Sequence, residues 1–95
     1  MNTYELTVIL RNSDAEATRE KVMGILQKYS VNVLLDEPWG LRKLAYQIEN
    51  EKEGFYLFMN IEASPDSVQK ITSDFRLNHD ILRYLFIAIK QTKSA

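Results

Sequence analysis

The chain has 95 residues, and 45% of them are hydrophobic, which is enough to build one domain around a buried core. Twelve basic and 13 acidic residues give a net charge of -1, which argues against a module that coats nucleic acid through a broad basic field. The absence of cysteine excludes disulfides, thiolate metal sites and a cysteine nucleophile, and it fits a cytoplasmic protein.

The N-terminal segment predicts a strand followed by a helix. It lacks the charged start and the long apolar stretch of a secretion signal. One apolar row of this strand, alternating with mostly polar residues, comprises Tyr4, Leu6, Val8 and Leu10. Ser13 followed by Glu16 predicts a capping box, so a helix should begin at Asp14. Its apolar face is Ala15, Thr18, Val22, Ile25 and Tyr29.

The middle of the chain predicts two strands joined by a polar hairpin. The first covers 31–35, meets Pro38, and resumes over 41–48. We expect a bulge or bend at Pro38, because proline has no N–H to donate to a strand ladder. Residues 49–54 should form the hairpin tip, and 55–62 the next strand.

The C-terminal third predicts a second helix and a last strand. Ser64 is placed to cap the helix, and Pro65 suits its first position. Asn78 is expected to end the helix in a left-handed conformation. The last strand should span 81–90, followed by a loose tail at 91–95.

This order of elements predicts a single α+β domain over residues 1–95 with the ferredoxin-like βαββαβ arrangement. Right-handed crossovers give a four-stranded antiparallel sheet with both helices packed on one face. The other side of the sheet, here called the open face, has no helix to cover it. Parity places four apolar side chains there, Tyr56, Phe58, Leu85 and Ile87. Contiguous exposed apolar area on a small domain usually marks a partner site. The alternative is that side chains from loops or from the tail fold over it.

Residues 39–48 combine cations with aromatic rings on a predicted strand. Arg42 and Lys43 lie close in sequence to Trp39, Tyr46, Tyr56 and Phe58. Such a strand suits RNA, because phosphates attract the cations and bases stack on rings. The plainer alternative is a surface hairpin with solvated charges. Further cations that the fold could bring to the same region are Arg76, Arg83 and Lys90.

No pattern in the chain indicates catalysis, a metal or a cofactor. His79 is the only histidine and is expected in a turn after the second helix. Three alternating glutamates at the predicted hairpin tip are expected to be solvated, because a calcium loop needs more oxygen ligands. No glycine-rich phosphate loop exists, and no apolar run is long enough to cross a bilayer. We therefore expect no catalytic residue, no cofactor, no small-molecule substrate and no membrane contact.

Several motifs resemble the bacterial small-subunit ribosomal protein six family over nearly the whole chain. The most specific is Gly-x-Arg-x-Leu-Ala-Tyr at residues 40–46, and Tyr4-Glu5, Gly54-Phe55-Tyr56 and Leu82-Arg83 support it. The resemblance implies a structural role on the ribosome. It also implies binding to the central domain of small-subunit ribosomal RNA, as a heterodimer with the basic small-subunit protein eighteen.

The resemblance also distributes roles over this chain. It implies RNA contacts at Tyr4, Arg42, Arg76 and Arg83. Lys43 and Lys90 are added as candidate RNA contacts because they are positively charged. Trp39, Tyr46 and the hairpin strands with Tyr56 and Phe58 are the candidates for the protein partner. Two departures from the family stand out. Asn2 and Thr3 replace a basic pair found in some members, and Gln47 replaces a proline found in many.

Two binding alternatives share the same element order. A generic RNA-recognition module would need a cation where Glu53 stands, and the first strand offers it only Tyr4 as a partner ring. A small-molecule regulatory domain would need a glycine-rich turn after the first strand, where residues 11–13 read Arg-Asn-Ser. A third alternative, a small phosphatase of this fold, would need a glycine-rich loop after the first strand to hold phosphate, and this chain has none there.

Overall fold

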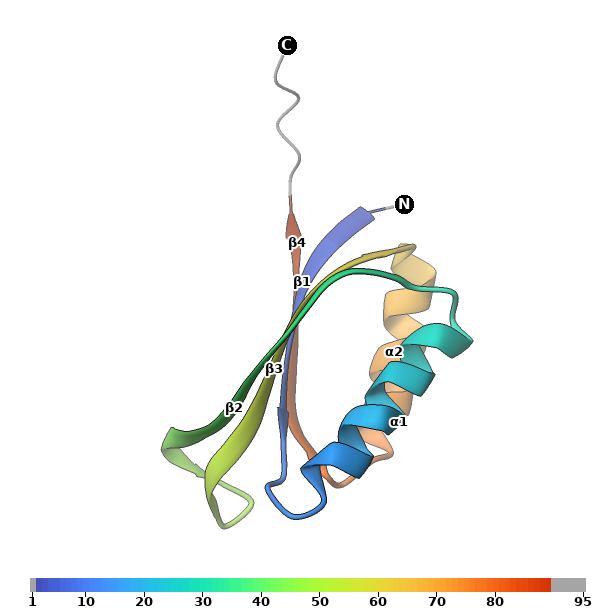
Figure 1. The fold of residues 1–95 in the computed structure, drawn as a ribbon. Helices are drawn as coiled ribbons and strands as arrows, with labels where there is room; N and C mark the ends of the chain where they lie inside the picture. The colour runs from blue at the N-terminus through green and yellow to red at the C-terminus, as the bar shows by residue number, and fades with distance from the viewer. Residues whose placement is uncertain (1, 90–95) are drawn as a thin grey trace.

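The computed structural model describes residues 2–89 as one sheet with two helices (Figure 1). The elements are β1 (Asn2–Leu10), α1 (Ala15–Lys28), β2 (Asn32–Ile48), β3 (Glu51–Ala63), α2 (Pro65–Arg76) and β4 (Ile81–Ile89). The four strands pair antiparallel in the order β2-β3-β1-β4, and both helices lie on the same side of the sheet. The predicted ferredoxin-like fold is confirmed. The tail predicted at 91–95 lies outside the described residues.

The core lies between the sheet and the two helices. Burial alternates along β1, and the predicted inner rows of β1 and β3 are confirmed, with Leu6, Val8, Leu57 and Met59 fully buried. The inner row of β4 follows the same parity. In the structure Tyr84 and Phe86 face inward and pack on Phe75 of α2, with ring centroids 5.5 and 6.3 Å away. Leu85 and Ile87 therefore lie on the open face, as predicted.

The N-terminus of α1 differs from the prediction. The N-cap residue is Asp14, in a left-handed conformation with φ 56°, and its side chain makes no capping hydrogen bond. Glu16 is therefore the second helical residue, one position short of the place that a capping box requires. The prediction of a Ser13–Glu16 capping box is wrong because the helix begins one residue later than expected.

The start of α2 is as predicted, but its end is not. The Ser64 hydroxyl oxygen accepts a hydrogen bond from the N–H of Ser67 at 3.1 Å, and Pro65 is the first helical residue. The helix ends at Arg76, and Asn78 is not left-handed. The Oδ1 atom of Asn78 instead accepts the N–H of Asp80 at 2.9 Å. Asn78 thus stabilises the turn before β4 through its side chain, an alternative that asparagine offers readily.

Strand β2 runs the full length that the sequence divided in two. Register shifts on β3 occur at three places, one of them between Pro38 and Gly40, so the predicted bulge is confirmed. The strand continues through Pro38 because β2 is an edge strand, where a missing N–H can face water. The hairpin tip is shorter than predicted. Glu49 and Asn50 alone make the turn, with φ 47° and 69°, and β3 begins at Glu51.

Gly40 directly follows Trp39, the residue that the bulge leaves without a partner, and its φ of +80° is costly for any residue with a Cβ. Gly40→Ala is therefore expected to lower the free energy of unfolding by about 1–3 kcal/mol. Gly24→Ala is the matched control, because Gly24 lies inside α1 with nothing within 4 Å of an added Cβ. It is expected to raise stability by about 0.5–1 kcal/mol. Urea unfolding of both variants measures the two effects, and equal signs would contradict this account of the bulge.

No helix within residues 2–89 has the length and apolarity needed to cross a membrane.

Candidate functional site

The open face carries exposed apolar side chains from several strands. Leu85 and Ile87 of β4 are 56% and 48% exposed, although they lie in the interior of a regular strand. Tyr56 and Phe58 of β3 are half-buried on the same side, opposite Ile9 and Thr7 of β1. No segment within residues 2–89 covers the exposed pair. The predicted apolar surface on this face is therefore present.

An aromatic stack joins Trp39 of β2 to Phe58 of β3. The rings of Trp39 and Phe58 are parallel within 16°, with centroids 5.4 Å apart. The guanidinium carbon of Arg42 lies 5.8 Å from the Trp39 ring, within cation–π distance. The bulge at Pro38 and Gly40 sets the spacing that lets Trp39 reach across to Phe58. Arg42, which the sequence grouped with RNA contacts, thus shares its position with rings assigned to a protein partner.

A second cation–π pair joins the two edges of the sheet. The guanidinium carbon of Arg83 on β4 lies 6.0 Å from the ring of Tyr46 on β2. β2 and β4 are the outer strands, so this contact needs an explanation. β1 pairs with β3 only as far as Leu10, whereas the β2–β3 pairing extends beyond this point. The hairpin therefore projects past the end of β1 and approaches the start of β4.

The other predicted RNA residues do not join these pairs. Tyr4 is buried against the helices, and its ring meets Phe86 edge-on at 6.3 Å. Arg76 lies at the end of α2, where its Nε donates to the Tyr84 hydroxyl at 3.1 Å. Lys43 is exposed and opposite Glu53 in the hairpin. Lys90 lies outside the described residues. Arg42 and Arg83 are thus the members of this predicted set that take part in cation–π pairs on the open face.

Sequence reasoning could have found one of these two pairs. Arg42 follows Trp39 by three residues, a spacing that a bulged strand can bring onto one face. The contact between Tyr46 and Arg83 had no local signal, since it depends on how far β1 extends. The predicted separation of RNA cations from partner aromatics did not anticipate that each arginine lies over a ring.

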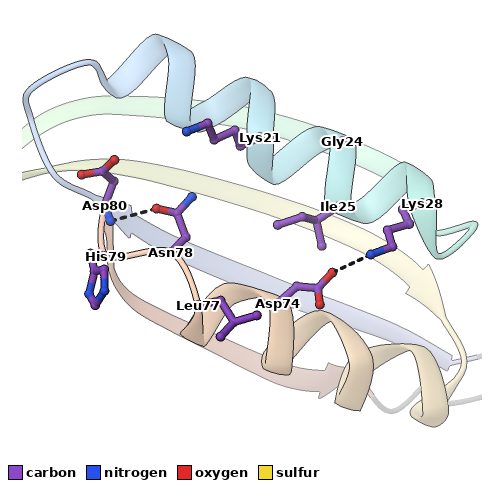
Figure 2. A pocket seen from close by; sticks show the side chains of 9 residues that line it. All are labelled: Lys21, Gly24, Ile25, Lys28, Asp74, Leu77, Asn78, His79 and Asp80. Carbon is purple, nitrogen blue, oxygen red and sulfur yellow. Dashed lines mark hydrogen bonds and ion pairs between the residues drawn. The ribbon is translucent and has the colours of Figure 1, made fainter.

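A shallow groove lies on the opposite side of the molecule, between α1 and α2 (Figure 2). It has a volume of about 730 Å³ and is lined by residues of α1, α2 and the turn before β4. Lys28 donates to Asp74 across it at 3.3 Å. Hydrogen bonds with Tyr29 and then with Asp74 raise the pKa of Lys28. His79 lies in the turn at the end of this groove, as predicted.

The groove is open, so a ligand in it would remain exposed to water, and its Lys28–Asp74 ion pair is already formed within the chain. Within residues 2–89 no group of three or more histidine, aspartate or glutamate side chains is placed to hold a metal ion. The open face with its two cation–π pairs is therefore the stronger candidate for function.

Comparison with known proteins gives consistent matches over most of the chain. A family model described as ribosomal protein S6 matches residues 3–88. The small ribosomal subunit protein bS6 of Porphyromonas gingivalis is 34% identical over 99 residues, covering 100% of this chain and 83% of its own. The bS6 protein of Alkaliphilus metalliredigens is 35% identical, covering 96% of this chain and 100% of its own.

Solved structures agree on the fold. The crystal structure of 30S ribosomal protein S6 from Thermotoga maritima matches with a TM-score of 0.82 at 24% identity, over 93% of this chain and 87% of that one. The C-terminal domain of MgtC from Mycobacterium tuberculosis matches with a TM-score of 0.65 at 9% identity. Since such different proteins share the arrangement, the fold by itself assigns no function.

Proposed function

This chain belongs to the ribosomal protein S6 family, whose members are structural constituents of the small ribosomal subunit, and we propose how it joins that subunit. In this proposal it binds the central domain of small-subunit ribosomal RNA together with the basic small-subunit protein eighteen. The observation that carries the proposal is the open face, where exposed apolar side chains lie beside two arginines held over aromatic rings.

The apolar part of the open face suits a protein partner. Leu85 and Ile87 lie side by side on one row of β4, and an apolar area of this kind is stabilised when another protein covers it. The chain itself has a net charge of -1, so it gains little from long-range attraction to RNA. A basic partner seated on this face would supply the charge that the chain lacks.

The two arginines suit phosphate groups at the border of that contact. A guanidinium held near a ring still has N–H donors that can form paired hydrogen bonds to a phosphate. Arg42 and Arg83 are both exposed, so their outer edges are accessible to a ligand. Because few phosphates are met in this way, RNA binding by the chain should depend only weakly on salt.

The open face favours this proposal over a generic RNA-recognition module. Such a module stacks bases on rings of its two central strands. Here the open row of β1 consists of Thr3, Glu5, Thr7 and Ile9. The ring of Phe58 on β3 is already stacked under Trp39. The centre of the sheet is therefore a poor stacking platform for bases and a better surface for a protein.

Arg83→Ala tests the proposed RNA contact. The binding partner in this test is a complex of protein eighteen with an RNA fragment from the central domain of small-subunit ribosomal RNA. Loss of one phosphate contact should lower the affinity of the chain for this complex, and should reduce the slope of log affinity against log salt by about 1. The domain should remain folded, because Arg83 is exposed. Filter binding over a salt series measures both quantities. Lys70→Ala on α2 removes the same charge far from the open face and should leave them unchanged. Equal effects of the two substitutions would count against a contact at Arg83.

A further inference from the structure

The hairpin of β2 and β3 extends beyond the rest of the sheet. Residues 42–54, here called the overhang, pair only with each other, since β1 ends opposite Phe55. A register shift between Lys43 and Ile48 further weakens their pairing. An isolated two-stranded hairpin is only marginally stable in water. The overhang therefore needs an additional contact to keep one position.

Arg11 supplies one such contact, because it directly follows Leu10, which pairs with Phe55 of β3 on one side and Ile81 of β4 on the other. Its Nη1 forms an ion pair with Oε2 of Glu51 on the overhang at 3.0 Å. Its Nη2 donates to the carbonyl oxygen of His79 at 3.1 Å, and its Nε lies 3.6 Å from Oδ1 of Asp80. The backbone N–H of Arg11 donates to the Asp80 carbonyl at 2.7 Å. One side chain, 24% exposed, thus connects the overhang to the turn before β4.

The contact at Arg11 bears on the pair formed by Tyr46 and Arg83. Tyr46 belongs to the overhang, and Arg83 lies three residues after Asp80, so Arg11 fastens the two segments that carry them. Ile48 and Glu49 at the tip face Leu82 and Arg83 across a hollow of about 490 Å³. If the tip moved away from β4, this hollow would open and Tyr46 would leave the Arg83 guanidinium.

We propose that Arg11 is a positioning residue, which fixes the overhang against the start of β4 and so holds Tyr46 and Arg83 together on the open face. The inference rests on the proposed function, in which Arg83 meets RNA beside the protein partner. Arg11 itself is engaged with Glu51, His79 and Asp80, and it acts through the placement of the other two side chains.

The role requires arginine rather than any cation. The guanidinium presents five N–H donors in a fixed plane, and here they reach acceptors on two separate segments. A lysine ammonium is a compact point charge on a flexible stem, so it could pair with Glu51 or with Asp80 but would not fix their relative position.

The test compares Arg11→Gln and Arg11→Lys with Arg19→Gln in the full chain. Arg19 is a matched control, because it forms a comparably buried ion pair with Asp36 at 2.7 Å that joins α1 to β2 outside the overhang. Amide hydrogen exchange measures the overhang directly, and exchange of β1 and α1 amides shows whether the domain stays folded. Binding to protein eighteen with the RNA fragment is measured on the same variants.

In Arg11→Gln, exchange of the overhang amides should accelerate about tenfold or more while β1 and α1 amides change little. Binding should weaken about tenfold, because two interface side chains lose their fixed position. Arg11→Lys should restore only part of each effect, and Arg19→Gln should produce neither. Unchanged exchange of the overhang in Arg11→Gln would overturn the proposal.

Two further outcomes separate this proposal from the proposed function. If the overhang loosens in Arg11→Gln but binding stays the same, while Arg83→Ala weakens binding, the positioning role is overturned and the RNA contact stands. If the overhang loosens and neither Arg11→Gln nor Arg83→Ala changes binding, the positioning role and the proposed function are both overturned.

Discussion

Leu85→Asp is expected to weaken binding to protein eighteen by about 30-fold or more while leaving the fold intact. Leu85 is 56% exposed on the open face, so aspartate there costs the isolated chain little. In the complex, the same carboxylate would be buried against an apolar surface without a partner, which is strongly unfavourable. A loss of about 2 kcal/mol is usual for a central interface position and corresponds to this factor. Isothermal titration calorimetry with purified protein eighteen measures the change.

The chain provides a matched control for this substitution. Leu77 is 80% exposed at the end of α2, on the helix side. Leu77→Asp makes the same chemical change on the opposite side of the molecule, and binding should remain as in the unaltered chain. Equal losses in the two variants would contradict a partner surface on the open face, and so would unchanged binding of Leu85→Asp.

Phe75→Ala is expected to lower the free energy of unfolding by about 3–5 kcal/mol. The Phe75 ring is 1% exposed and packs against Tyr84 and Phe86 of β4. Its loss would leave a cavity between α2 and the sheet that the surrounding rings cannot fill without leaving their rotamers. Chemical unfolding in urea, with a check that the denaturant slope is unchanged, gives the difference.

Tyr46→Ala serves as the comparison for Phe75→Ala. Tyr46 is 66% exposed, so removing its ring should change stability by about 0.5 kcal/mol or less. A loss below about 1 kcal/mol for Phe75→Ala would show that the contact between α2 and β4 does not hold the core together.

The order of elements could be predicted because each element carries a local signal. Tyr4, Leu6, Val8 and Leu10 alternate with more exposed residues because one face of the sheet is buried. The same alternation in β3 identifies the buried face of that strand. Ser64 and Pro65 marked the start of α2 correctly, since a cap depends only on residues three apart. Element order and crossover handedness then left few topologies to choose from.

The errors occurred where several local signals compete. Ser13 and Asp14 are both good capping residues, and the N-cap residue in the structure is Asp14, in a left-handed conformation. Asn78 and Asn50 are both residues that tolerate positive φ, but only Asn50 adopts it. The propensity of a residue indicates which backbone conformations it tolerates, and the neighbouring tertiary contacts decide which of these conformations it adopts.

The candidate site was predictable in part. Exposed apolar residues on the open face followed from counting rows on β3 and β4, because only one row of each can meet the helices. The pairing of Tyr46 with Arg83, and the contact of Arg11 with Glu51, depend on where β1 ends relative to its neighbours. No periodic pattern records such a difference in strand length, so these contacts required the structure.

Methyl-group NMR of the chain with and without protein eighteen and the RNA fragment tests whether the open face is the surface that meets the partner. Leu85 and Ile87 report on the open face, while Ile25 and Leu77 report on the groove between the helices. We expect the signals of Leu85 and Ile87 to shift or broaden on complex formation and those of Ile25 and Leu77 to stay in place. Shifts confined to Ile25 and Leu77, with Leu85 and Ile87 unchanged, would rule out the open face as the partner surface.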